Sequence, residues 1–316
     1  MALHTTTGRW RLGFALSLTT ALLWGVLPIA LKLLLDDLDA YTTTWFRFVF
    51  AALLLFLFIS KRAGTKTFRL AASAPLWLMV AVCLSLCGNY IVYLTGLNYI
   101  NPSTATVVIQ LAPLMLVLGG VLIYKERLWP LQKLGIGLLV IGLLLFFSDR
   151  IASLIENKGD YTHGILLIIV SGALWASYGL AQKQLLRHLS SETILLVIYL
   201  VGGLLFLPMI NLPSLAGLSG FSIGLLLFCS LNTLFAYGAF AEALNHWEAS
   251  RVSAVVAITP LLTIFCMWIG HIAFPKLFIS EKLSLLNLAG AVIVVVGSML
   301  GALGTNLGGS KSAQPK

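Results

Sequence analysis

The chain has 316 residues, of which 59% are hydrophobic and 10% are charged, and its mean hydropathy is +0.98. A soluble domain carries roughly 25% charged residues, so this composition excludes an ordinary soluble protein and requires apolar surface that faces lipid. The 20 Lys and Arg residues against 11 Asp and Glu residues give a net charge of +9. In a membrane protein that balance reflects basic cytoplasmic loops rather than a nucleic-acid partner.

Ten apolar segments are long enough to cross a bilayer as helices, which takes about 20 residues. In chain order they are residues 12–35, 41–60, 74–97, 102–123, 132–148, 163–183, 192–210, 220–242, 250–274 and 284–304. The first is too long for a signal peptide and further spans follow it, so we expect it to be retained. The seventh is the weakest, because Gly202, Gly203 and Pro208 interrupt it. The sequence predicts an all-α membrane protein with ten transmembrane helices.

The distribution of basic residues predicts the orientation. With the N-terminus in the cytoplasm, 14 of the 20 Lys and Arg residues fall in cytoplasmic segments and four in external loops. Basic residues collect in cytoplasmic loops, so we expect both termini in the cytoplasm, in a bacterial inner membrane. Five spans in each half would then give the two halves opposite orientations.

One phrase occurs twice in the chain. ALLWGVLPIALKLL contains Trp24 and Lys32, and GALWASYGLAQKQL contains Trp175 and Lys183, each at an offset of 151 residues. Both phrases fall in the first span of a half. This points to an internal repeat that begins at the first and the sixth spans.

Two further blocks repeat in the same order. LNYINPSTATVVIQLAPL (97–114) matches LNHWEASRVSAVVAITPL (244–261) at an offset of 147. The last block, at an offset of 155, aligns Glu126, Gly135 and Gly142 with Glu281, Gly290 and Gly297. The sequence predicts two inverted five-helix repeats, residues 1–150 and residues 151–316. Such repeats are common in secondary transporters, where they enclose a central site.

The repeated segments, together with RFVFAALLL (47–55), resemble the drug/metabolite transporter superfamily, and its EamA-type branch most closely. The resemblance covers roughly residues 12–304. It implies ten helices with internal pseudo-symmetry and secondary transport of small metabolites, usually outward. Spans 3, 4, 8 and 9, with 1 and 6, would surround the cavity, and spans 5 and 10 would lie at the periphery. Small multidrug exporters of the superfamily carry a glutamate in the first span, but here no carboxylate precedes Asp36.

Mid-span aromatic and polar side chains are the candidate substrate-binding residues. A tryptophan half-way through a span either packs against another helix or walls a cavity, and a mid-span amide needs a hydrogen-bond partner. We expect an amphipathic, aromatic-rich cavity. Its candidate residues are Trp24, Pro28, Asn89, Tyr90, Tyr93, Thr106, Gln110, Trp175, Tyr178, Asn232, Tyr237, Phe240 and Ser253.

A polar stripe runs along span four and returns in span nine. Ser103, Thr106, Gln110 and Pro113 share one helical face by their spacing, and Ser250, Ser253, Ala257 and Pro260 repeat it. Small hydroxyl residues at such positions serve helix packing or line a cavity. The long amide of Gln110 has no counterpart in the second half.

Four charged residues in or near spans are candidates for gating or coupling. Lys32 and Lys183 are repeat-related, and each either gates the cavity or snorkels to the interface. Glu242 is the best acidic candidate for proton coupling, against a solvated carboxylate at a span end. Arg47 either supports helix packing or pairs with an acidic residue of the external mouth, the candidates being Asp36, Asp37 and Asp39.

These features favour a secondary transporter, an exporter of amino acids or related small metabolites that works by alternating access. The alternatives are an importer or exchanger of another metabolite, such as a vitamin, a nucleobase or a drug-like amphiphile, and a non-transporting membrane subunit. No HExxH, G-x-S-x-G or Walker A motif indicates an enzyme or an ATP-driven pump. We expect no cofactor or metal, the lipid bilayer and a proton or exchanged metabolite as partners, and a monomer or homodimer. The four cysteines lie in apolar runs without a CxxC pair and predict neither a disulfide nor a zinc site: Cys83, Cys87, Cys229 and Cys266.

Overall fold

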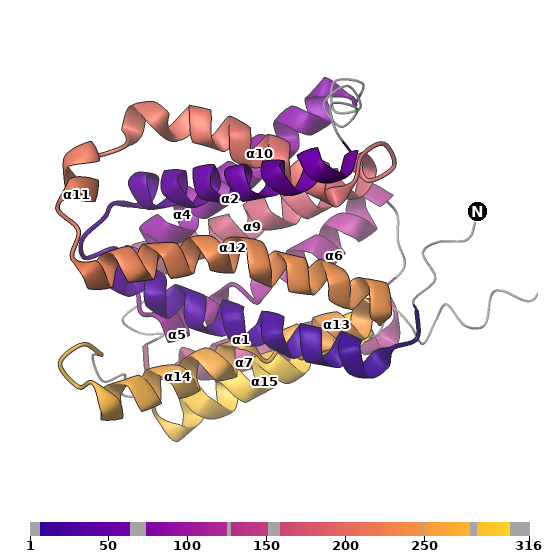
Figure 1. Ribbon diagram of the computed structural model, residues 1–316. Helices are drawn as coiled ribbons and strands as arrows, with labels where there is room; N and C mark the ends of the chain where they lie inside the picture. The colour runs from indigo at the N-terminus through magenta and orange to yellow at the C-terminus, as the bar shows by residue number, and fades with distance from the viewer. Residues whose placement is uncertain are drawn as a thin grey trace, which may run out of the picture.

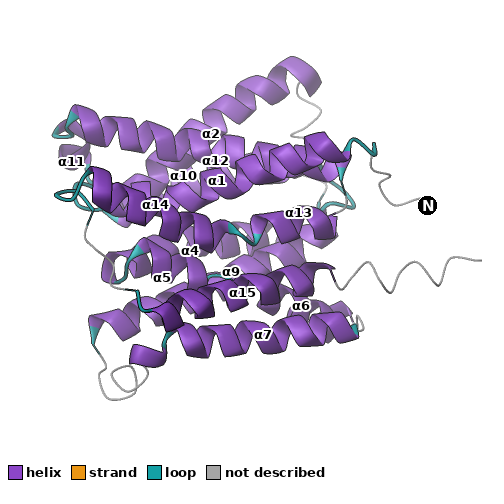
Figure 2. Ribbon diagram, turned by 90° about the horizontal axis from the view of Figure 1, so that it is seen from below, coloured by secondary structure: helices purple, strands orange, loops and turns teal. Residues whose placement is uncertain are grey.

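The computed structural model describes residues 7–63, 74–124, 128–150, 159–247, 249–278 and 283–303. Within these ranges every regular element is a helix, and the helices lie roughly along one axis as a bundle (Figures 1 and 2). Glu126 and Glu281 of the repeat lie outside the described residues.

The first half contains five helical spans. They are formed by α1 (Trp10–Leu34), α2 (Ala40–Ala63), α4 (Leu76–Tyr99), α5 (Pro102–Val108) with α6 (Leu111–Tyr124), and α7 (Pro130–Phe146), and a 3-10 turn η1 (Ser148–Arg150) follows. The second half repeats the order. Its elements are α9 (Asp160–Leu185), α10 (Ser191–Phe206) with the 3-10 turn η2 (Leu207–Met209), α11 (Leu212–Ala216), α12 (Gly220–His246), α13 (Ala249–Val256) with α14 (Thr259–Ala273), and α15 (Leu285–Leu303).

The described helices confirm a ten-helix membrane protein. Nine of their spans are long and apolar enough to cross a membrane, and α7, with 17 residues, is a shorter apolar tenth. Large apolar side chains such as Leu122 and Leu285 are exposed, as lipid-facing residues would be. The seventh span forms in spite of its glycines. Gly202 lies so close to Phe48 that a Cβ atom would be 2.4 Å from the ring, so a residue that weakens a helix is used here for close packing.

The two ends of the bundle are distinguished by the chain ends. Helix α1 begins, and helix α15 ends, at the same end of the molecule, on the right in Figures 1 and 2. We call it the termini end, and the other the opposite end. Lys32 in the last turn of α1 reaches the end of α4, so α1 and α4 run in the same direction. Helix α9 runs against α4, because Asn89 contacts Ser171 and Gly96 lies against Gly164. The repeat-related helices α1 and α9 therefore have opposite directions.

The contacts between the halves follow a pseudo-twofold relation. Helix α12 packs along α1 as α4 packs along α9. The hydroxyl of Thr20 donates to the carbonyl of Ala236 at 3.4 Å, and the hydroxyl of Ser171 donates to the carbonyl of Asn89 at 3.3 Å. Thr20 and Ser171 are related by the offset of 151, and Asn89 and Ala236 by the offset of 147. The two interfaces are thus repeats of one another.

Helices α7 and α15 make the closest contact between the halves, through glycines at repeat-related positions. A Cβ atom on Gly135 would lie 2.6 Å from the carbonyl oxygen of Gly297, and one on Gly290 would lie 2.7 Å from that of Gly142. The backbones meet directly, as small residues allow in membrane helices. Two glycines seven residues apart in each helix therefore fix the register of the pair.

Spans four and nine are broken in the middle, which the sequence analysis did not predict. Helix α5 ends at Val108 and α6 starts at Leu111, while α13 ends at Val256 and α14 starts at Thr259. Pro113 and Pro260 follow the breaks, and proline has no N–H to donate to the carbonyl four residues earlier. The breaks are related by the repeat, and α5 packs against α14.

We predict that Gly142→Ala destabilises the protein. The new Cβ atom would lie 2.6 Å from the backbone nitrogen of Val294 and 2.8 Å from the carbonyl oxygen of Gly290, and overpacking of this kind costs about 1–3 kcal/mol. Thermal unfolding in detergent measures the loss. Gly137→Ala is the matched control on the same helix, because no atom lies within 4 Å of its Cβ position. Equal unfolding temperatures for the two variants would contradict the direct backbone contact.

Candidate functional site: a cavity at the crossing of two broken helices

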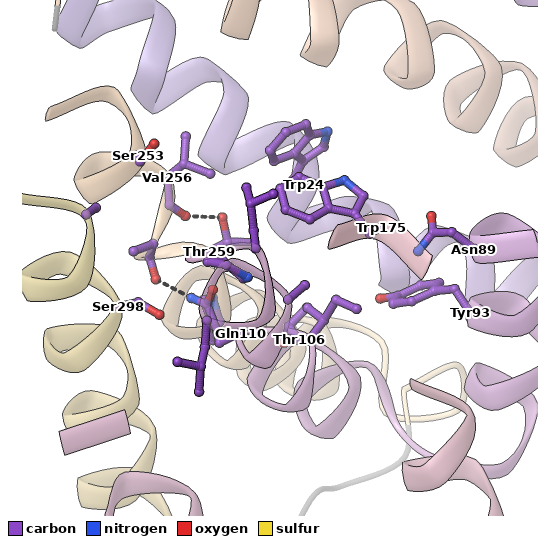
Figure 3. Close-up of a pocket in the computed structure, with 18 of the residues that line it drawn as sticks. Trp24, Asn89, Tyr93, Thr106, Gln110, Trp175, Ser253, Val256, Thr259 and Ser298 are labelled. Atoms are coloured by element: carbon purple, nitrogen blue, oxygen red, sulfur yellow. Dashed lines mark hydrogen bonds between the residues drawn. The ribbon is translucent and has the colours of Figure 1, made fainter. Parts of the chain in front are cut away.

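The side chain of Gln110 joins the two breaks. Its amide nitrogen donates to the carbonyl oxygen of Ala257 at 2.8 Å (Figure 3). In a continuous helix that carbonyl would bond to the N–H of Leu261, which instead bonds to Ile258 at 3.0 Å. Gln110 and Ala257 are repeat mates, so a side chain of one half satisfies the carbonyl freed at the same position in the other.

A second freed carbonyl of the break in span nine is satisfied locally. Pro260 cannot donate to the carbonyl of Val256, and the hydroxyl of Thr259 does so at 2.6 Å (Figure 3). An unpaired carbonyl inside a membrane costs several kcal/mol. The two side-chain hydrogen bonds therefore make non-helical backbone tolerable at this depth.

A cavity of about 500 Å³ lies beside the crossing. It is lined by α1, α2, α4, α5, α6, α7, α9, α12, α13, α14 and α15, so both halves contribute. Gln132 near the start of α7 and Ala302 near the end of α15 line it, so it extends from the middle of the bundle toward the termini end. Twelve of the candidate binding and gating residues line it: Trp24, Pro28, Arg47, Asn89, Tyr90, Tyr93, Thr106, Gln110, Trp175, Tyr237, Phe240 and Ser253.

Aromatic rings form much of the wall. Trp24 packs edge-on against Tyr237, with ring centroids 5.3 Å apart, and lies 5.7 Å from Phe240. Trp175, the repeat mate of Trp24, lies beside it (Figure 3). The sequence analysis left open whether a mid-span tryptophan packs against another helix or walls a cavity. Trp24 does both, because it packs on α12 and also faces the cavity.

The predicted residues Tyr178 and Asn232 do not line the cavity. Tyr178 is buried in an apolar cluster with Phe48, Tyr90 and Tyr199. The amide nitrogen of Asn232 donates to the carbonyl of Leu23 at 2.7 Å and ties α12 to α1. Both side chains therefore have packing roles in this arrangement.

Lys32 lies at the opposite end of the bundle and joins α1 to α4. Its ammonium group donates to the carbonyls of Leu97 and Asn98, at 2.7 and 2.8 Å. These carbonyls end helix α4, where the helix dipole favours a cation. Beneath this contact Leu34, Leu94 and other apolar side chains form a buried cluster. Lys32 thus joins the C-terminal ends of α1 and α4.

Two further gating candidates, Lys183 and Glu242, also lie outside the cavity lining. Lys183 is exposed in the last turn of α9. Glu242 lies on α12, with its side chain 54% exposed, and pairs with the ring of His246 at 3.0 Å. The other ring nitrogen, Nδ1, forms a hydrogen bond with the hydroxyl of Thr7 at 2.7 Å. Glu242 therefore sits in a polar cluster at the termini end.

Arg47 does not pair with the acidic residues of the first loop. Asp37 accepts a hydrogen bond from Ser222, and Asp39 accepts from the backbone and hydroxyl of Thr42. The guanidinium of Arg47 instead faces the cavity, where it donates to the hydroxyl of Thr233.

Several lining residues were not predicted, among them Leu27, Gln132, Thr233, Thr259 and Ser298. Helical spacing could have identified Thr233, because positions 233, 237 and 240 share one face. Asn232, one position earlier, points to a different neighbour. The position of a residue on the helical face that carries Tyr237 thus predicts cavity lining better than the polarity of the residue does.

Comparison with known proteins decides the family. The EamA-like transporter family matches residues 11–148 and again residues 162–302. The chain belongs to this family. It is 39% identical to an uncharacterized transporter of Haemophilus influenzae over 297 residues, covering 94% of this chain and 96% of that protein. It is 36% identical over 300 residues to the Escherichia coli K12 protein named "Uncharacterized inner membrane transporter YhbE", covering 94% and 93%.

More distant similarities extend over the same length. The Salmonella typhimurium protein named "Probable amino-acid metabolite efflux pump" is 21% identical over 303 residues, covering 92% of this chain and 94% of that protein. A solved structure with 16% sequence identity superposes with a TM-score of 0.64 over 96% of this chain and 99% of the other, which supports the fold alone. The protein is an integral membrane transporter of the EamA-like family.

We predict that Gln110→Leu lowers the stability of this transporter. The substitution keeps the side-chain volume but leaves the carbonyl of Ala257 buried without its donor, which costs about 1–3 kcal/mol. Thermal unfolding in detergent measures the change. Ser253→Ala is the control, because this hydroxyl also lines the cavity but makes no hydrogen bond to the described residues. An unchanged unfolding temperature for Gln110→Leu would show that the crossing does not depend on this hydrogen bond.

Proposed function

We propose that the protein exports amino acids or related small metabolites across a bacterial inner membrane by alternating access. The observation that carries the proposal is the aromatic-walled cavity of about 500 Å³ in the middle of the bundle, built from both repeats. Its volume lies within the range of small-molecule sites, about 300–1,000 Å³. Substrate sites of repeat-built transporters lie at this depth, between the halves.

Two relatives support the substrate class and the membrane. The Salmonella typhimurium protein is named for amino-acid metabolite efflux, and the Escherichia coli protein for the inner membrane. The excess of Lys and Arg in alternate loops favours an orientation with both termini in the cytoplasm. In this orientation the cavity extends toward the cytoplasm, and the end closed by Lys32 faces outward.

The repeat supplies the second gate of the cycle. Lys32 holds the carbonyls of Leu97 and Asn98, and the repeat mates of these three residues are Lys183, Leu244 and Asn245. In the proposed cycle, Lys183 holds the carbonyls of residues 244 and 245 when the cytoplasmic end closes. The same two contacts, used at opposite ends, then enclose the cavity from either side.

We expect Trp24→Leu and Trp175→Leu to abolish substrate-dependent thermal stabilisation and substrate counterflow in proteoliposomes, because both rings wall the cavity. The ligands are tested as a panel of amino acids and related metabolites. Trp77→Leu is the control, since this ring is 65% exposed on the lipid-facing surface. A panel that gives no flux with the wild-type protein would argue for a non-transporting subunit. Flux retained by both tryptophan variants would place the substrate elsewhere.

We expect Lys32→Met to open the external end. The variant loses two charge-assisted hydrogen bonds, each worth about 1.5–3 kcal/mol. In a cysteine-free background, Leu31→Cys places a thiol in the cavity wall. Its labelling by a membrane-impermeant maleimide from outside should become several-fold faster when Lys32→Met is added. Lys276→Met removes an exposed lysine and should leave the rate unchanged. Equal rates in both variants would exclude Lys32 as a gate.

A further inference from the structure

Arg47 is buried within a membrane-spanning helix of the bundle and lines the cavity. Its side chain is 2% exposed and lies on α2, against Tyr90 of α4 and Thr233 of α12. The guanidinium carbon is 4.9 Å from the centre of the Tyr90 ring. A charged group inside a membrane is costly, and it is expected to have a functional partner.

The protein gives Arg47 few partners. A guanidinium has five N–H donors, but Nε and Nη2 both donate to the same hydroxyl, that of Thr233, at 3.1 and 2.9 Å. Nη1 makes no hydrogen bond to any residue in the described ranges. No acidic side chain is found among the described residues that line the cavity. A buried arginine thus faces the cavity without a counter-charge.

The repeat shows that the scaffold does not require this charge. The side chain of Asp39 caps α2 by accepting from the backbone N–H of Thr42, and the side chain of Ser190 caps α10 by accepting from that of Thr193. The two caps are 151 residues apart, so the offset of 151 that relates α1 to α9 also relates α2 to α10. The repeat mate of Arg47 is then Ile198, which is fully buried in an apolar cluster. The corresponding position of the second half is occupied by a residue that only packs.

From this geometry we propose that Arg47 is the ligand for a carboxylate of the transported molecule. The proposal rests on the transport function proposed above and narrows its substrate class. A guanidinium binds a carboxylate through two parallel hydrogen bonds. Arg47 lines the cavity and keeps N–H donors that Thr233 does not accept. A bound carboxylate would supply the missing counter-charge.

The rest of the wall indicates what the carboxylate is attached to. Trp24, Trp175, Tyr93 and Tyr237 offer ring faces and edges, and apolar groups bind such surfaces. An ammonium group would find no carboxylate among the described lining residues, and the ring faces could bind it by cation–π contact. The substrate class is therefore a monocarboxylate with an apolar or aromatic body, with the amine either present or blocked.

The test uses four probes that share one body. Phenylalanine and N-acetylphenylalanine carry the carboxylate, while N-acetylphenylalanine amide and phenethylamine lack it. Binding to the purified full-length protein is measured by thermal shift and by tryptophan fluorescence. We expect the two carboxylates to bind and to have dissociation constants roughly 10- to 100-fold below those of the other probes, the factor lost with a charge-assisted hydrogen bond. Absence of any carboxylate-dependent response overturns the inference, whichever probe binds.

Arg47→Met and Arg47→Lys locate the effect. Without ligand, Arg47→Met should be as stable as the wild type or more so, because an apolar side chain replaces an uncompensated buried charge. Its preference for carboxylates should disappear, and Arg47→Lys should keep part of it. Arg187→Met removes an exposed arginine and should behave as wild type. A less stable Arg47→Met protein that still prefers carboxylates would show a structural role and overturn the inference.

Two measurements keep the outcomes distinct. If Arg47→Met does not fold, Arg47→Lys tests the inference instead. If Arg47 binds the carboxylate, this variant has a lower affinity for the two carboxylate probes and an unchanged affinity for the amide. Counterflow in proteoliposomes tests transport separately. The wild-type protein could transport the amide or the amine as fast as the carboxylates, and Arg47→Lys could leave that flux unchanged. This result would support the proposed transport function but refute Arg47 as the carboxylate ligand.

Discussion

The structure depends on one constraint, that backbone groups inside a membrane must find partners within the protein. Nearly all of them do so in helices. The exceptions are the breaks of spans four and nine, which cross where the halves meet. In span nine Gln110 and Thr259 supply the missing donors, and in span four the backbone N–H of Ala112 donates to the carbonyl of Ile109. Because these groups satisfy freed carbonyls, two helices can end at mid-depth, and a cavity can form beside them without exposing unpaired backbone to lipid.

The pseudo-twofold relation is kept at the packing contacts and in the tryptophan pair of the cavity wall, and it is lost at two polar positions beside the cavity. The glycine contacts of α7 and α15 and the hydroxyl contacts of Thr20 and Ser171 repeat in both halves. Gln110 faces Ala257, and the apolar mate of Arg47 is Ile198. Repeated packing gives both halves the same range of movement. Gln110 and Arg47, which have no polar repeat mate, then give the single site between the halves a chemistry that neither half has alone.

The sequence predicted the spans well because a membrane helix follows from length and apolarity, and the ten-helix prediction required no tertiary information. The breaks were missed although Pro113 and Pro260 were noticed. Proline removes one N–H, and a helix such as α1 continues through Pro28, so whether a span ends there depends on its neighbours. The cavity lining has the same limit. Asn232 and Thr233 are adjacent polar residues, and only the rotation of α12 against α1 decides which of them faces inward.

In the proposed cycle, the substrate moves the equilibrium only by the difference in its interactions with the two states. Gates built from repeat-related lysines and helix-end carbonyls have similar strengths, so neither state is strongly favoured by the gates themselves. The difference has to come from residues near the crossing that exist in one half only. Arg47 lies on α2 and contacts α12 through Thr233, so its position relative to the cavity changes when the halves rock. A carboxylate held there would pair with the charge to a different extent in each state, and that difference would couple substrate binding to the movement.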